Sequence, residues 1–119
     1  MNPQLVGIEE LTGTYPFDIR LSMKAMRLNR FFWQMREASA RNMWLENRNA
    51  AYDAAKLTQE ERTLIDNTDW LGLIQYGVCF FVLEKYARVV KTTNLAVYAS
   101  MRGETLEAFL KTRQVPEAV

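Results

Sequence analysis

The stretch from Trp70 to Val90 constrains this chain more than any other segment. It reads WLGLIQYGVCFFVLEKYARVV and is 21 residues long. Few of its side chains are strongly polar, namely Gln75, Glu84, Lys85 and Arg88. A short apolar block does not define its own period, but the length of this one favours a helix over a strand. A helix that is apolar on nearly every side must be covered by the rest of the protein or by a partner.

Both ends of this stretch carry helix-terminal signals. Asp69 or Thr68 is a suitable N-cap. Basic residues occupy the last two turns and the position after them, where cations complement the helix dipole: Lys85, Arg88 and Lys91. We therefore predict a compact multi-helix domain around one long apolar central helix over about residues 69–90. The polar residues within the helix argue against a membrane span.

The composition limits the function classes that need to be considered. At 119 residues the chain is long enough for one domain with a modest core. The apolar fraction of 49% argues against disorder, and the net charge of +1 argues against electrostatic binding of nucleic acid. Residues 1–8 lack the basic region and the apolar run of a signal peptide, so we expect a cytoplasmic protein.

The chain contains no histidine and a single cysteine, Cys79. This excludes a disulfide within the chain, a zinc site with the usual ligands, and an iron site made of two histidines and a carboxylate. It also removes the commonest general base at neutral pH. We therefore predict no metal site, no cofactor and no catalytic residue on this chain alone.

We expect the chain to divide into an N-terminal arm, residues 1–15, and a helical domain, residues 16–119. Pro16 suits a helix entry. From Phe17 to about Ser39, one apolar face repeats at helical spacing: Leu21, Ala25, Leu28, Phe32 and Met35. A second stripe lies on another side, at Ile19, Met26 and Trp33. This stripe is either buried within the domain or directed at a partner.

The remaining segments also read as helices, so the predicted fold class is all-α. Residues 41–56 form one or two short helices. Thr58 and Glu61 form a capping box that starts a helix at Gln59 and carries it to about Asn67. The segment Leu95–Met101 is apolar and of uncertain type. A last amphipathic helix covers residues 104–113.

Two polar residues near the apolar core have two interpretations each. Glu84 has an apolar neighbourhood at helical spacing, so it is either a carboxylate with acid–base or hydrogen-bonding function or an edge residue paired with Arg88. Physical reasoning alone favours the pair with Arg88. Tyr98 is either a site residue or a ring at the core edge with its hydroxyl in water.

Several motifs, in order along the chain, resemble a known family. They are TGTYPF (Thr12–Phe17), KAxRLN (Lys24–Asn29), YGVxFFxLEK (Tyr76–Lys85), NLxxYAxMRG (Asn94–Gly103) and KTR (Lys111–Arg113). Together they resemble the small domain of bacterial type II extradiol dioxygenases. In that family the domain is a separate alpha subunit, as in protocatechuate 4,5-dioxygenase, or the C-terminal part of a fused chain, as in gallate dioxygenase. The resemblance is closer to the gallate type.

The resemblance implies a helical cap over the active site of a large subunit, which holds a non-haem Fe(II) that binds the catechol oxygens and dioxygen. It implies that Glu84 and Tyr98 contact an aromatic catechol acid, such as gallate or protocatechuate, at the subunit interface. This reverses the preference for Glu84 as a surface residue. The expected assembly is a hetero-oligomer with the large (beta) subunit, with a homodimer possible for the isolated chain. The chain is then a separate subunit or an excised domain.

Two rival functions remain open at this stage. The first is a free-standing helical interaction or recognition module that keeps the fold without the enzyme. The second is a homo-oligomeric ligand-binding protein. Copurification with an iron-bearing large subunit separates the accessory subunit from both.

Overall fold

The apolar stretch Trp70–Val90 folds as two helices, so the prediction of one long central helix over residues 69–90 is wrong. Helix α6 (Trp70–Tyr76) ends at Gly77, whose φ of 119° lies in the left-handed region. Helix α7 (Phe80–Val89) begins after Cys79, whose backbone is extended. A Cβ at position 77 would lie 2.5 Å from the carbonyl oxygen of Leu21. Hydrophobic periodicity misses this break because the apolar character continues through it.

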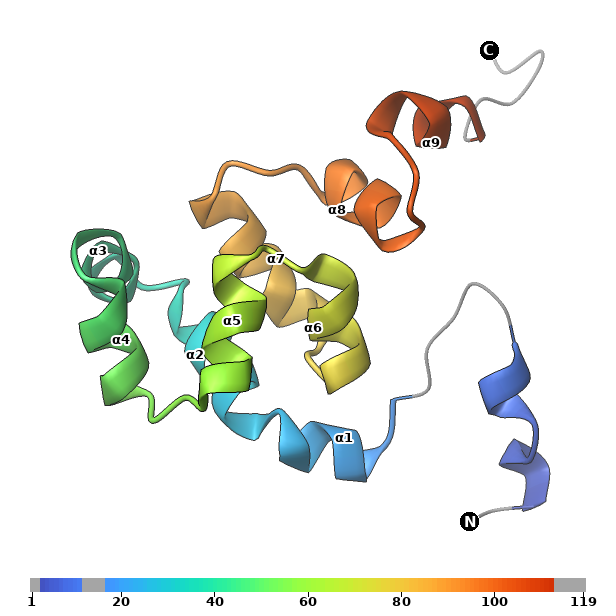
Figure 1. The fold of residues 1–119 in the computed structure, drawn as a ribbon, viewed down its shortest axis with the longest axis horizontal. Coiled ribbons are helices and arrows are strands. Elements are labelled where there is room, and N and C mark those ends of the chain that lie inside the picture. The colour runs from blue at the N-terminus through green and yellow to red at the C-terminus, as the bar shows by residue number, and fades with distance from the viewer. Residues whose placement is uncertain (1–2, 12–16, 113–119) are drawn as a thin grey trace.

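The computed structural model describes residues 3–11 and 17–112, except for the side chain of Glu9, and all regular structure in these ranges is helical. The all-α prediction is confirmed. Two 3-10 turns, η1 (Pro3–Leu5) and η2 (Ile8–Glu10), precede the α-helices (Figure 1). The helices besides α6 and α7 are α1 (Ile19–Lys24), α2 (Met26–Gln34), α3 (Ala38–Glu46), α4 (Arg48–Ala54), α5 (Gln59–Asp66), α8 (Asn94–Met101) and α9 (Leu106–Thr112).

The helix predicted from residue 17 to about residue 39 is divided in the structure. Helices α1 and α2 meet at Ala25, where ψ is 12°, and α2 ends at Gln34. Arg41 fixes the following turn, because its guanidinium donates to the carbonyl oxygens of Met35 (2.9 Å) and Arg36 (2.8 Å). The predicted apolar face is confirmed as buried at four positions and half-buried at Leu21; the buried residues are Ala25, Leu28, Phe32 and Met35.

The helix caps predicted from the sequence are confirmed for α5 and α6. The amide of Glu61 donates to Thr58 Oγ1 (3.2 Å), and the amide of Thr58 donates to Glu61 Oε1 (2.8 Å), which confirms the capping box of α5. Asp69 caps α6 by accepting from the amide of Gly72 (2.9 Å). The segment of uncertain type is helix α8, whose N-cap is Thr93.

Several expectations concern residues that the structure does not describe. The proposed boundary between an arm, 1–15, and a domain, 16–119, falls at residues 12–16, outside the described ranges. The helix entry at Pro16 and the last residue of the predicted final helix, Arg113, lie outside them as well. These boundaries stay predictions.

Tyr86 on α7 lies at the centre of an aromatic core. Its ring centroid is 5.1 Å from that of Phe32, 5.5 Å from that of Trp44 and 5.5 Å from that of Trp70. Its hydroxyl donates a hydrogen bond to the carbonyl oxygen of Ile65 (3.0 Å). Helices α2, α3, α6 and α7 therefore meet at one residue, with α5 attached through the hydroxyl.

The helices form a thin body, with extents of 49 × 41 × 22 Å. Helices α3 and α4 lie at one end, α2, α5 and α7 in the middle, and α8 and α9 beyond them, with η1 and η2 standing apart (Figure 1). A thickness of 22 Å corresponds to about two layers of packed helices. No helix in the described part of the chain is long and apolar enough to cross a bilayer.

Replacing Gly77 with alanine should destabilise the fold more than the same change at Gly103. Both glycines have positive φ, but a Cβ meets backbone at position 77 and open space at position 103. Left-handed strain alone costs about 1–2 kcal/mol, so Gly103→Ala should lose about that much. Gly77→Ala should lose about 3 kcal/mol or more, because the clash with Leu21 adds to the strain. Urea unfolding of both variants tests this; equal losses would contradict the close approach.

The buried tyrosines should make the fold sensitive to alkali. Burial raises the pKa of Tyr86 to about 12, and burial with a hydrogen bond to Asp66 raises the pKa of Tyr52. An unfolded tyrosine ionises near pH 10, whereas the folded protein keeps these two hydroxyls protonated to higher pH. Their contribution to the free energy of unfolding is therefore complete below pH 10. It is lost as the pH rises towards 12, by about 1.4 kcal/mol per pH unit for each tyrosine. Urea unfolding across this range should show a shallower decline for Tyr86→Phe than for wild type. An unchanged slope would contradict the assignment.

Candidate functional site

Helices α7 and α8 meet along a line of four side chains that we call the α7–α8 seam: Phe80, Glu84, Asn94 and Tyr98. Phe80 and Glu84 lie one turn apart on α7, and Asn94 and Tyr98 lie one turn apart on α8. Phe80 stacks on Tyr98, and Glu84 accepts a hydrogen bond from Asn94. These two contacts pair the start of one helix segment with the end of the other, so α7 and α8 run antiparallel here. The seam brings both predicted site residues together.

Glu84 is half-buried and is held through one of its two carboxylate oxygens. Its Oε1 accepts from Nδ2 of Asn94 at 3.1 Å, and Oε2 has no hydrogen-bond partner among the described residues. The alternative pair with Arg88 is not found among the ion pairs of the described residues. The carboxylate is therefore oriented by a neutral donor, and one oxygen keeps its capacity to accept from a ligand.

Tyr98 is oriented by its ring. Its centroid lies 5.0 Å from that of Phe80 with an interplanar angle of 20°, and 6.3 Å from that of Phe109 on α9. The hydroxyl makes no hydrogen bond within the described ranges, as expected for a ring at the core edge with a free polar tip. Stacking therefore fixes the ring while leaving the hydroxyl free to donate or accept.

Two pockets next to α7 are lined in part by cations, and the second of them includes the seam residue Asn94. One, of about 410 Å³, is lined by Met35, Arg36, Arg41, Leu45, Lys85, Arg88 and Val89. The other, of about 500 Å³, is lined by Arg88, Lys91, Thr92, Thr93, Asn94 and Leu95. Lys85, Arg88 and Lys91 form no ion pair with a carboxylate in the described part of the chain. Asn94, which donates to Glu84, also lines the second pocket together with Arg88 and Lys91. The positive charge of these two residues favours the approach of an anionic group to the seam from this pocket.

No cluster of histidine, cysteine, aspartate or glutamate among the described residues has the arrangement of a metal site. Cys79 is half-buried, and its amide donates to Oδ1 of Asn29 at 2.7 Å. The seam itself offers one carboxylate and one phenol, which suit hydrogen bonding to hydroxyl groups rather than metal ligation.

Two asparagines have roles that sequence reasoning did not identify. Asn29 belongs to the KAxRLN motif without an assigned role, and its side-chain amide bridges two backbone groups on either side of the break between α6 and α7. Asn94 belongs to the NLxxYAxMRG motif without an assigned role. The four-residue spacing between Asn94 and Tyr98 is the signal that places both on one helix face. Nothing local identifies Glu84 as the partner of Asn94.

Comparisons with known proteins agree on one family. Residues 28–114 match the family described as the LigA subunit of the aromatic-ring-opening dioxygenase LigAB. The chain is also 48% identical over 113 residues to a gallate dioxygenase of Pseudomonas putida. That match covers 95% of this chain and 33% of the relative, so the chain spans about a third of the length of that dioxygenase. All four seam residues lie within the family match.

The hydrogen bond between Glu84 and Asn94 should appear as a coupling free energy. In a double-mutant cycle with Glu84→Ala and Asn94→Ala, we expect about 1 kcal/mol, because the acceptor is charged but only half-buried. The matched cycle with Glu84→Ala and Arg88→Ala should give a coupling near zero. Urea unfolding of the single and double variants measures both. A larger coupling to Arg88 than to Asn94 would restore the ion-pair interpretation.

Proposed function

The chain belongs to the LigA-subunit family of aromatic-ring-opening dioxygenases, and we propose that it is the accessory small subunit of an extradiol enzyme. In this proposal it caps the active site of a large polypeptide and contributes contacts to a catechol-type acid such as gallate or protocatechuate. The single observation that carries the proposal is the α7–α8 seam, where Glu84 and Tyr98 are held by Asn94 and Phe80.

The proposed division of labour places the iron on the large polypeptide. This chain has no histidine and spans about a third of its gallate dioxygenase relative, so most of such an enzyme would lie elsewhere. The Fe(II) of the large polypeptide would supply the oxygen chemistry and the ring opening. The contribution of the small subunit is then binding, orientation and exclusion of water. The cytoplasmic location expected from the sequence stays a prediction.

Glu84 and Tyr98 would act as hydrogen-bonding groups for the ring hydroxyls. Asn94 occupies Oε1 of Glu84, so Oε2 is the acceptor for a substrate hydroxyl. Tyr98, fixed by stacking, donates to or accepts from a neighbouring hydroxyl. An analogue without that hydroxyl leaves a carboxylate in a closed site without its donor, which is a strong source of discrimination.

The substrate class is supported by the charge around the seam. Arg88 and Lys91 line the pocket that includes Asn94. The carboxylate of an aromatic acid carries a negative charge at neutral pH, and unpaired cations beside the site favour its approach. A neutral catechol lacks this attraction.

A helical interaction module without an enzyme is the second candidate. The exposed apolar side chains of α1 and α2 favour it, since they suit a binding partner of any activity. Mixing the purified chain with the large polypeptide decides between the two functions: the accessory subunit should raise ring-cleavage activity above that of either part alone. The isolated chain should show no turnover.

Glu84→Gln should lower the specificity constant of the assembled enzyme by about ten- to a hundredfold, because a charged hydrogen bond contributes about 1.5–3 kcal/mol. Tyr98→Phe should cost about 0.5–1.5 kcal/mol, as expected for a neutral hydrogen bond. Glu46→Gln, an exposed carboxylate on α3, is the matched control and should leave the kinetics unchanged. Steady-state kinetics with several catechol acids measure these effects. If Glu84→Gln moves only the melting temperature, the site assignment is wrong.

A further inference from the structure

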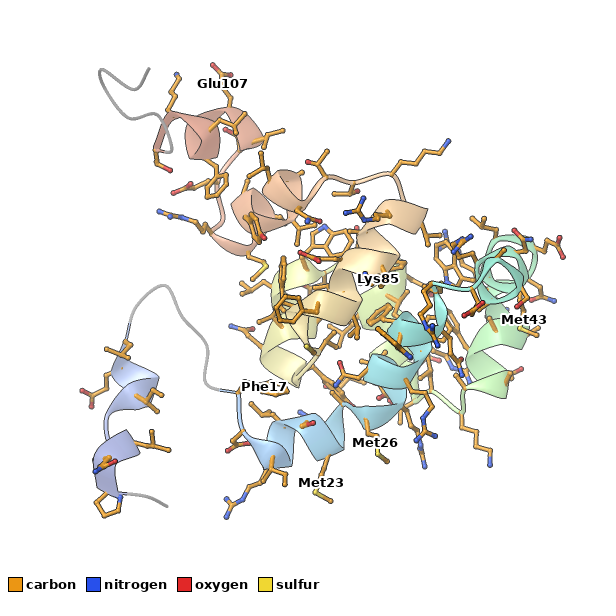
Figure 2. The ribbon with its side chains drawn as sticks, turned by 180° about the vertical axis from the view of Figure 1, so that it is seen from behind. Phe17, Met23, Met26, Met43, Lys85 and Glu107 are labelled. Atoms are coloured by element: carbon orange, nitrogen blue, oxygen red, sulfur yellow. The ribbon has the colours of Figure 1, made fainter. Side chains whose placement is uncertain are left out.

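Helices α1 and α2 carry an exposed apolar face that we call the α1–α2 stripe: Ile19, Met23, Met26 and Trp33. Their side chains are 75%, 69%, 54% and 47% exposed, respectively. Figure 2 shows Met23 and Met26 projecting from the edge of the ribbon, away from the body. Large apolar side chains exposed together on two consecutive helices form a patch of the kind that monomeric proteins rarely leave uncovered.

The stripe follows the spacing of a helix that contacts a second element. Ile19 and Met23 are four residues apart on α1, and Met26, Arg30 and Trp33 are separated by four and then three residues on α2. Each spacing places the side chains along one edge of their own helix. The opposite edge of α2 is already buried in the core, through Leu28 and Phe32. Helix α2 is therefore apolar on two sides, and only one of them is covered by the part of the chain that the structure describes.

The charges beside the stripe have one sign. Between residues 17 and 36 the chain has five cations and one carboxylate, Asp18. Asp18 is already used as the N-cap of α1. Three cations close to the stripe form no ion pair among the described residues, namely Arg20, Arg27 and Arg30. A complementary partner therefore presents an apolar ridge flanked by carboxylates.

These charges disfavour a second copy of the chain as the occupant. In a symmetric dimer the same patch faces itself, so Arg20, Arg27 and Arg30 would meet the same three cations of the other copy. Like charges in an interface cost stability unless counter-charges intervene, and this part of the chain offers only the capped Asp18. The stripe has enough apolar surface to bind a partner, but repulsion between its arginines disfavours binding to a second copy of this chain.

The gallate dioxygenase relative indicates what the occupant is. Its match leaves at most six residues of this chain uncovered, so it includes the whole stripe, and two thirds of the relative lie outside it. The family match begins only at residue 28, after three of the four stripe residues. This chain has an exposed apolar face, and its relative has a large additional segment that could cover such a face. Both observations are consistent with a contact between the α1–α2 stripe and a large polypeptide that corresponds to that segment.

We propose that the α1–α2 stripe is the surface on which the large dioxygenase polypeptide docks, through an apolar ridge flanked by acidic side chains. This inference rests on the proposed function and adds the place of attachment to it. Because α2 packs directly on α7, docking at the stripe also fixes the helix that carries Glu84 relative to the large polypeptide.

The test measures binding of this chain to the large polypeptide from the same organism, identified by its match to the rest of the gallate dioxygenase. The double variant Met23→Ser, Met26→Ser should raise the Kd at least tenfold, since it removes apolar contact area without touching the core. Leu110→Ser is the matched control: Leu110 is 38% exposed on α9, which lies far from α1 and α2 (Figure 1), and its Kd should match wild type. Arg20→Glu with Arg27→Glu should slow association at least tenfold at low salt, with a smaller effect at high salt.

Each alternative has its own result. Equal affinity of wild type and the Met23, Met26 variant for the large polypeptide overturns the stripe and leaves the proposed function intact. A wild-type chain that fails to bind the large polypeptide, with no gain in ring cleavage, overturns both. A dimer of the isolated chain that the Met23, Met26 variant abolishes identifies a second copy as the occupant. Binding to vesicles containing phosphatidylglycerol, lost in the same variant, identifies a lipid surface instead.

Discussion

The arrangement of this molecule depends on the side-chain amide of Asn29. From α2 it accepts a hydrogen bond from the amide of Cys79 (2.7 Å) and donates to the carbonyl of Gly77 (3.4 Å), 48 residues further along the chain. These are the backbone groups that lose helical partners where α6 ends and α7 begins, and buried backbone groups without partners are costly. The amide therefore permits the chain to break an apolar stretch inside the protein. It also sets the direction in which α7 leaves the break.

The direction of α7 determines both the core and the candidate site. One side of α7 carries Leu83 and Tyr86 into the aromatic core, where Tyr86 contacts rings from three other helices. Another side carries Phe80 and Glu84 to the seam with α8. A rotation of α7 that improved one set of contacts would disturb the other. The packing of the core and the geometry of the candidate site are consequently linked through the same helix.

The sequence was informative where the determining interactions are local. The capping box at Thr58, the N-cap at Asp69 and the buried face of α2 all depend on residues a few positions apart, and all were predicted. The break at Gly77 was not predicted, because it depends on the carbonyl of Leu21 and on Asn29, which are distant in sequence. Spacing suggested Arg88 as the partner of Glu84, whereas the structure places Asn94 there. The resemblance to the dioxygenase family predicts Glu84 and Tyr98 as substrate contacts, which stays a prediction, and it says nothing of Asn94 and Phe80, which hold them.

The thin body of the protein makes the stability of its fold sensitive to the concentration of a binding partner. A body 22 Å thick has a large surface for its volume, so the apolar area that it can bury on folding is limited. A partner that binds only the folded form adds stability by mass action, in proportion to the logarithm of its concentration. The melting temperature of such a subunit then reports the concentration of its partner. In the proposed assembly, dissociation and unfolding would be successive steps of one process, so dilution that separates the two polypeptides would also expose this chain to loss of structure.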